Sequence, residues 1–118
     1  MNQQALNRSL IVGTILQLLM ITVGHFIPEV VGPNFFPLVG TSIGAATGAL
    51  YGVWAAGANA GQGALGGAVA GGVAGVLGSA ASAALGDVPG STVAIAGGAT
   101  LVSGAIGGVL GRVIGKRG

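Results

Sequence analysis

The chain has 118 residues, and only 5% of them are charged. A soluble domain has about 25% charged residues, whereas this chain has none between Glu29 and Asp87. A soluble fold of this size cannot cover its surface without charges. The composition therefore excludes a soluble globular domain and predicts that lipid is the solvent. The mean hydropathy of +0.89 agrees with this interpretation.

The net charge of +2 comes from very few ionisable groups. A nucleic-acid module would show lysines and arginines clustered on a polar face, so we expect no nucleic-acid partner. Cysteine is absent. Its absence excludes disulfides, thiolate metal sites, cysteine nucleophiles and a lipid-modified cysteine.

The first predicted span, about residues 6–27, is rich in leucine and isoleucine and poor in glycine. We expect it to be an outer helix of a bundle. Arg8 precedes the apolar run as in a signal peptide, but no small-x-small cleavage site follows, so a retained span is expected. Thr14, Gln17 and His25 share one narrow polar stripe, which should face protein rather than lipid.

Glycines recur at every fourth position in the second predicted span, about residues 36–56. They are Gly40, Gly44, Gly48 and Gly52. Positions i and i+4 lie on one helix face, so these glycines form a groove without side chains. In lipid, helices associate through close packing of small residues. The pattern therefore predicts a closely apposed second helix.

The same spacing recurs in the third and fourth predicted spans, about residues 64–85 and 92–114. The third consists almost entirely of Gly, Ala and Ser, so we expect it at the centre, touching other helices on at least two sides. The glycines expected to pack in these two spans are Gly67, Gly71, Gly75, Gly104, Gly108 and Gly111.

These segments predict an all-α fold, a single domain over residues 1–118 with four transmembrane helices. The basic residues lie before the first span and at the end of the last: Arg8, Arg112, Lys116 and Arg117. Positive residues stay cytoplasmic, so both termini are expected there. An even number of spans then places Glu29 and Asp87 on the opposite side.

One polar cluster is a candidate site. His25, Glu29 and Asp87 fall near the same end of the bundle, and imidazole and carboxylates are ligands for zinc and similar ions. The competing interpretation is an interfacial histidine with a solvated carboxylate. We favour it, because there is no second histidine and no His-x-x-His spacing, and we predict no metal site. Gln17 could line a pathway, but we expect it to hydrogen-bond a neighbouring helix.

The sequence lacks the residues that several kinds of function require. No span has an acidic or basic residue at its middle, which argues against an ion-coupled transporter. One histidine and two turn carboxylates are a poor set for catalysis, so no enzymatic activity, catalytic residue or cofactor is expected. A bound pigment, quinone or lipid is compatible with the helix grooves, and the sequence neither supports nor excludes it. The glycine-rich runs lack the Gly-Lys-Ser/Thr ending of a phosphate loop.

Two stretches carry a resemblance. Residues 63–78, GALGGAVAGGVAGVLG, and residues 104–117, GAIGGVLGRVIGKR, resemble bacterial glycine-zipper membrane proteins. Those proteins are commonly lipid-anchored through a cysteine, which this chain lacks. The arrangement of small-x-x-x-small helices is also similar to that of the mitochondrial protein-import translocase family, where the leading helix is usually glycine-rich. The resemblance implies close helix packing and assigns no functional residue.

We expect a structural role in the membrane. The small-residue faces predict association with lipid-embedded helices, either copies of this chain or subunits of a larger complex, with Gly44, Gly48, Gly71, Gly75, Gly104 and Gly108 as contacts. The alternative is a small channel or holin-like pore lined by backbone and hydroxyl groups. The partner expected in both cases is the lipid bilayer, by default that of the bacterial inner membrane.

Overall fold

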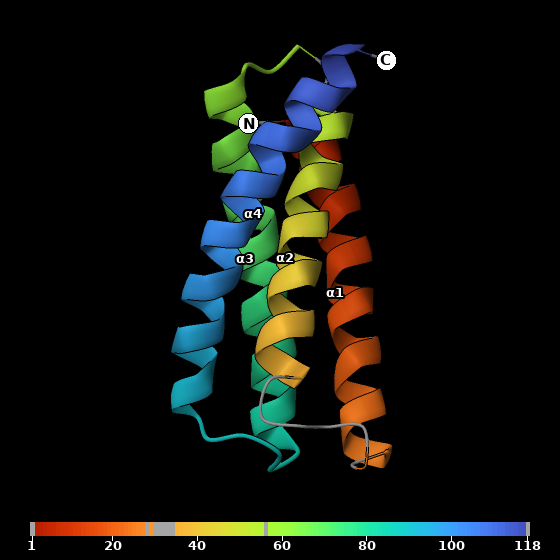
Figure 1. Ribbon diagram of the computed structural model, residues 1–118, viewed down its shortest axis with the longest axis vertical. Helices are drawn as coiled ribbons and strands as arrows, with labels where there is room; N and C mark the ends of the chain where they lie inside the picture. Colours follow the sequence, from red (N-terminus) through yellow and green to blue (C-terminus); the bar gives the residue numbers. More distant parts are fainter. Residues whose placement is uncertain (1, 28, 30–34, 56, 118) are drawn as a thin grey trace.

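The computed structural model describes residues 2–27, 29, 35–55 and 57–117 (Figure 1). The described chain has four helices and no strand, which confirms the all-α prediction. The helices are α1 (Gln3–Phe26), α2 (Phe35–Trp54), α3 (Ala60–Ala84) and α4 (Ser91–Arg117). Each overlaps one expected segment, and the ends differ from the expected ones by at most about one turn.

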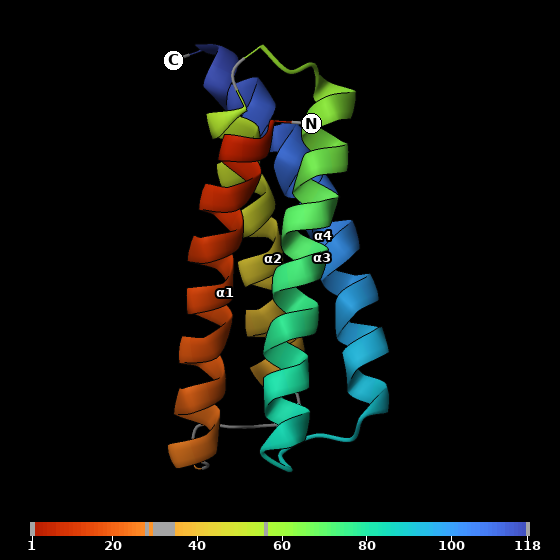
Figure 2. The ribbon, with the colours of Figure 1, turned by 180° about the vertical axis from the view of Figure 1, so that it is seen from behind.

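The helices run side by side, and both chain ends lie at one end of the bundle (Figures 1 and 2). α4 packs chiefly against α3 and α2, while α1 packs against the same two helices and barely touches α4. α3 therefore contacts all three other helices, as its small residues predicted. The bundle measures 42 × 22 × 20 Å, and its long dimension matches the thickness of a bilayer with headgroups, about 40–45 Å.

Local signals set where α3 begins and ends. Asn59 accepts a hydrogen bond from the Gln62 backbone N–H at 2.8 Å, and the Gln62 side chain accepts one from the Asn59 N–H at 2.9 Å. This reciprocal capping box starts the helix at Ala60, one turn before the sequence-based boundary. Gly86 follows the helix with φ of 80°, a left-handed conformation that glycine adopts readily.

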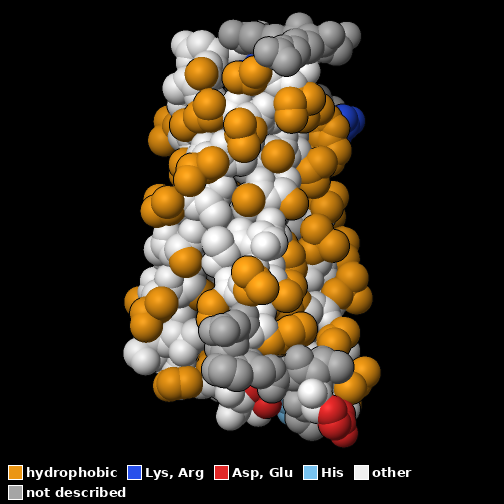
Figure 3. Space-filling view, in the orientation of Figure 1, with side chains coloured by type: hydrophobic (Ala, Val, Ile, Leu, Met, Phe, Trp, Pro, Cys, Tyr) orange, Lys and Arg blue, Asp and Glu red, His pale blue; other side chains and the backbone are white. Residues whose placement is uncertain are grey.

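Apolar side chains are spread along the length of the face of the bundle that Figure 3 shows. Bulky side chains such as Leu19 on α1, Leu65 on α3 and Ile106 on α4 are more than half exposed. Three helices, α1, α3 and the Ser91–Gly115 part of α4, are long and apolar enough to cross a membrane. These features are those of an integral membrane protein.

Backbone atoms form the contact where α2, α3 and α4 meet. A Cβ atom built on Gly48 or on Gly67 would overlap the carbonyl oxygen of Gly104, so α2, α3 and α4 meet at that oxygen. A Cβ on Gly108 would overlap the carbonyl of Gly63, which extends the α3–α4 contact toward the chain ends. At these positions only glycine allows the observed distance between helices.

Most of the other expected packing glycines lie in the contacts of α4 with α2 and α3, and one lies against α1. Close contact with α4 is made by Gly44, Gly52 and Gly71, and Gly75 lies against the Thr100 side chain. On α4 itself, Gly111 faces the carbonyl of Ala49 in α2. Gly40 differs, because a Cβ there would lie 3.6 Å from Met20, an ordinary van der Waals contact with α1.

Tyr51 contributes an interior contact that its position did not predict. Tyr51 lies in the last turn of α2, near an end of the bundle, yet it is only 1% exposed. Its ring occupies the space that a side chain at Gly66 would need. Its hydroxyl accepts a hydrogen bond from the Asn2 N–H at 3.2 Å, and so ties the start of α1 to α2.

We predict that Gly48→Ala destabilises the bundle by about 2 kcal/mol, because the added methyl group must displace the Gly104 backbone. The control is Gly98→Ala within α4, where no atom lies within 4 Å of the added Cβ. That control should be neutral or slightly stabilising, because alanine favours helix. Unfolding in detergent as SDS is added measures both. Equal stability of the two variants would contradict the contact at Gly104.

Candidate functional site

The polar cluster at the end opposite the chain termini is partly assembled. His25 at the end of α1 lies 2.9 Å from Asp87 in the α3–α4 turn, measured from Nδ1 to Oδ2. Glu29 is exposed and has no ion pair or hydrogen bond with the described residues. No three His, Cys, Asp or Glu side chains among the described residues are grouped as a metal site. The pair links α1 to the α3–α4 turn.

Gln17 lies in the interior of the bundle and is 2% exposed. Its Nε2 donates a hydrogen bond to the carbonyl oxygen of Gly40 in α2 at 3.3 Å. A Cβ on Gly78 of α3 would lie 2.8 Å from Gln17 Cβ, so glycine there makes room for the amide. The glutamine thus bonds a neighbouring helix, as expected, and no described residue donates a hydrogen bond to its Oε1.

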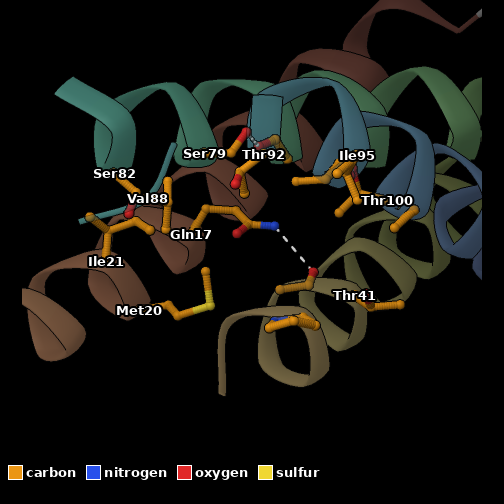
Figure 4. Close-up of a pocket in the computed structure, with 15 residues that line it drawn as sticks. Gln17, Met20, Ile21, Thr41, Ser79, Ser82, Val88, Thr92, Ile95 and Thr100 are labelled. Atoms are coloured by element: carbon orange, nitrogen blue, oxygen red, sulfur yellow. Dashed lines mark hydrogen bonds between the residues drawn. The ribbon is translucent and has the colours of Figure 1, made fainter. Parts of the chain in front are cut away.

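A pocket of about 120 Å³ adjoins Gln17, where α1 and α4 are separated (Figure 4). All four helices and the α3–α4 turn contribute to its wall. The lining residues are Gln17, Met20, Ile21, Pro37, Gly40, Thr41, Gly75, Ser79, Ser82, Val88, Thr92, Ile95, Ala96, Ala99 and Thr100. None of these side chains is ionisable, so the pocket is a neutral site with a mostly apolar wall.

The hydroxyl groups in this wall are of two kinds. A helix hydroxyl usually donates to a carbonyl three or four residues earlier. Ser79 does so to Gly75 at 2.7 Å, and Thr100 does so to Ala96 at 2.8 Å. Ser82, by contrast, is 1% exposed, and its Oγ has no partner among the described residues.

Arg112 forms a second buried polar site, at the end of the bundle that holds the termini. The sequence assigned it to the basic tail, but it is only 6% exposed. One guanidinium nitrogen, Nη1, donates hydrogen bonds to the carbonyl oxygens of Gly52 at 2.8 Å and Ala55 at 2.7 Å. These carbonyls lie at the C-terminus of α2, where a cation is favoured by the helix dipole. The arginine therefore caps α2.

We predict that Arg112→Met destabilises the protein by about 2 kcal/mol, because two buried carbonyls lose a charged donor while the apolar stem is kept. Arg8→Met is the control, since Arg8 is exposed on α1. SDS-induced unfolding in detergent should separate the two variants. If both arginines were equally dispensable, Arg112 would not act as a cap.

Three features of the interior were not found from the sequence. The pocket depends on where helices diverge, and the depth of Arg112 depends on how α4 packs against α2. Gly13 is the third, because a Cβ there would lie 2.6 Å from the Thr47 methyl group. Its signal was present, since Gly13 is the one glycine in the middle of an otherwise bulky first helix.

The fold and these sites define a helical membrane bundle with a neutral internal pocket. Comparison of the chain with protein families, curated proteins and solved structures finds no match.

Proposed function

We propose that this chain is a four-span protein of the bacterial inner membrane with a structural, non-catalytic role. In this proposal it associates with an apolar helix from a second copy or from another membrane subunit. The observation that carries the proposal is an open groove on the outer surface between α3 and α4.

The groove combines small residues with apolar walls. Its floor includes Gly72 and Gly97, and its rim includes Val73, Val76 and Leu101. Gly98, also in the groove, has no atom within 4 Å of the position of a Cβ. Small residues let a second backbone approach closely in lipid. A transmembrane helix is thus the ligand whose shape and polarity fit this surface.

The glycines that were expected to contact partner chains lie inside the monomer. Gly44, Gly48, Gly71, Gly104 and Gly108 are buried within the monomer against α2, α3 or α4. In the proposal their glycine zipper holds the chain's own helices together. Gly75 belongs with them, because it packs against Thr100. Association between chains is assigned to the α3–α4 groove instead.

The charge distribution supports cytoplasmic termini. Figure 3 shows acidic side chains at the end away from the chain termini, and basic ones near the other end. Arg8 and Arg112 belong to the helix ends beside the termini, while the side chains of Lys116 and Arg117 lie outside the described part. The positive-inside rule places that end in the cytoplasm.

The position of α2 supports a fourth span. By length and hydropathy α2 is not among the helices that qualify alone. It nevertheless packs against α1, α3 and α4, and its Thr47 and Ser42 hydroxyls donate to carbonyls of their own helix. Neighbouring helices and these internal bonds would reduce the cost of placing the hydroxyl groups of α2 in the membrane.

The alternative is a channel or holin-like pore. The centre of the bundle argues against a pore through one copy, because the Gly48, Gly67 and Gly104 backbones are in contact there. A pore would have to form between several copies. Conductance of protein-containing liposomes, with association measured on the same sample, separates this alternative from a purely structural role.

We predict that Gly98→Leu weakens association at least tenfold, because the side chain fills the groove. Ala46→Leu is the matched control, since Ala46 is exposed on α2 outside the groove. Native mass spectrometry after gentle extraction measures both variants. A fixed homo-oligomer would show self-association, and co-extracted different subunits would show an accessory role. A wild-type monomer without partners would contradict the proposal.

A further inference from the structure

We propose that the pocket beside Gln17 binds a neutral six-membered ring that carries a hydroxyl or carbonyl oxygen, such as a phenol or a quinone ring. This inference concerns the interior of one monomer and does not depend on association through the α3–α4 groove. Size, polarity and unpaired hydrogen-bonding groups each support it.

The size of the pocket fits a single ring. Its volume is about 120 Å³, and an engineered apolar cavity of about 150 Å³ binds benzene. The pocket is only partly enclosed, so a tail attached to the ring could extend out of it. Apolar residues from three directions, including Met20 on α1, Pro37 on α2 and Ile95 on α4, supply the surface for the ring.

The hydroxyl groups without a hydrogen bond favour a ligand that carries an oxygen atom over a purely apolar one. The buried Ser82 hydroxyl has no partner among the described residues, and in Figure 4 its side chain points toward Val88 and Ile21 in the pocket wall. A buried hydroxyl without a hydrogen bond is costly. A carbonyl or phenol oxygen in the pocket would accept the bond that Ser82 is able to donate.

The other three helices also place hydrogen-bonding side chains in the pocket wall. Thr41 of α2 and Thr92 of α4 line the pocket, and their hydroxyls make no hydrogen bond with the described residues. In Figure 4 the Gln17 amide nitrogen is directed to α2, which leaves Oε1 as an acceptor for a ligand hydroxyl. Each of the four helices thus offers one group to an oxygen-bearing ring.

Charge and polarity exclude the other common occupants. A bare acyl chain would leave the hydroxyls unpaired, and a charged ligand would find no counter-ion in a wall without ionisable residues. Asp87, which precedes the pocket residue Val88 in the sequence, is already joined to His25 by a hydrogen bond. Neutral ring compounds with an oxygen satisfy both the apolar wall and the unpaired groups.

The test uses the full-length protein in phosphatidylcholine nanodiscs. Fluorine NMR follows 4-fluorophenol and fluorobenzene, two rings of similar size, and empty nanodiscs correct for partitioning into lipid. We expect saturable binding of 4-fluorophenol and about tenfold weaker binding of fluorobenzene. Equal binding of the two rings, or binding no greater than to empty nanodiscs, would overturn the proposal.

Two variants and a control locate the site. Ser82→Ala should remove most of the preference for phenol while leaving the unliganded protein at least as thermally stable, because it deletes an unpaired hydroxyl. Ser9→Ala, also fully buried but bonded to its own helix and outside the pocket, should keep the preference. Ala96→Phe should abolish binding of both rings. Binding that survives Ala96→Phe in a folded protein would place the ligand elsewhere and refute the site.

A second ligand pair separates two sources of the same chemistry. A phenol with a decyl tail and the tail-free phenol are compared in the same nanodiscs. Tighter binding of the tailed ring, after correction for partitioning, supports a lipid-borne ring compound as the natural occupant. Equal binding supports a small soluble phenol. Failure of both to bind refutes the proposal, whatever the outcome for association.

Discussion

The contact of three backbones at the Gly104 carbonyl is the constraint on which the bundle depends. A glycine hydrogen lies in the direction in which a Cβ would point, so Gly48 and Gly67 each direct a Cα–H at this oxygen. Such contacts are worth about 0.5–1 kcal/mol each, and they bring many dispersion contacts with them. They offset the cost of glycine in a helix, about 1 kcal/mol per residue, only if the helices stay in contact.

The pocket follows from the same constraint. Close contact fixes α4 against α2 and α3, on the side of the bundle away from α1. Near Thr100 the contacts of α4 change from glycine backbone to side chains. The space left between α1 and α4 is filled only in part, by the Gln17 amide and small side chains. The glycine contacts of α4 with α2 and α3 therefore close the bundle toward one end and leave a neutral cavity toward the other.

The sequence predicts the local features well. Four-residue glycine spacing identifies a small helix face because helix geometry alone places those residues together. It cannot say which helix that face meets, and the glycines of α4 in fact face two, with Gly104 and Gly108 toward α3 and Gly111 toward α2. The sequence also does not show how deeply a side chain is buried. Arg112 has the charge of a tail residue, but it is buried and caps α2. The predicted topology of four spans was enough to place His25 and Asp87 at the same end of the bundle, where they form a hydrogen bond. The pocket joins residues from all four helices, so no local pattern reveals it.

The most direct test of this account is a measurement of proton contacts between glycines in lipid bilayers. A Cβ on Gly48 would lie 2.8 Å from the Gly104 Cα, and one on Gly71 would lie 2.9 Å from it. Solid-state NMR should therefore show Hα–Hα cross-peaks from Gly104 to both Gly48 and Gly71. If only sequential cross-peaks from Gly104 to its chain neighbours appeared, the helices would not meet through their backbones, and the account would be wrong.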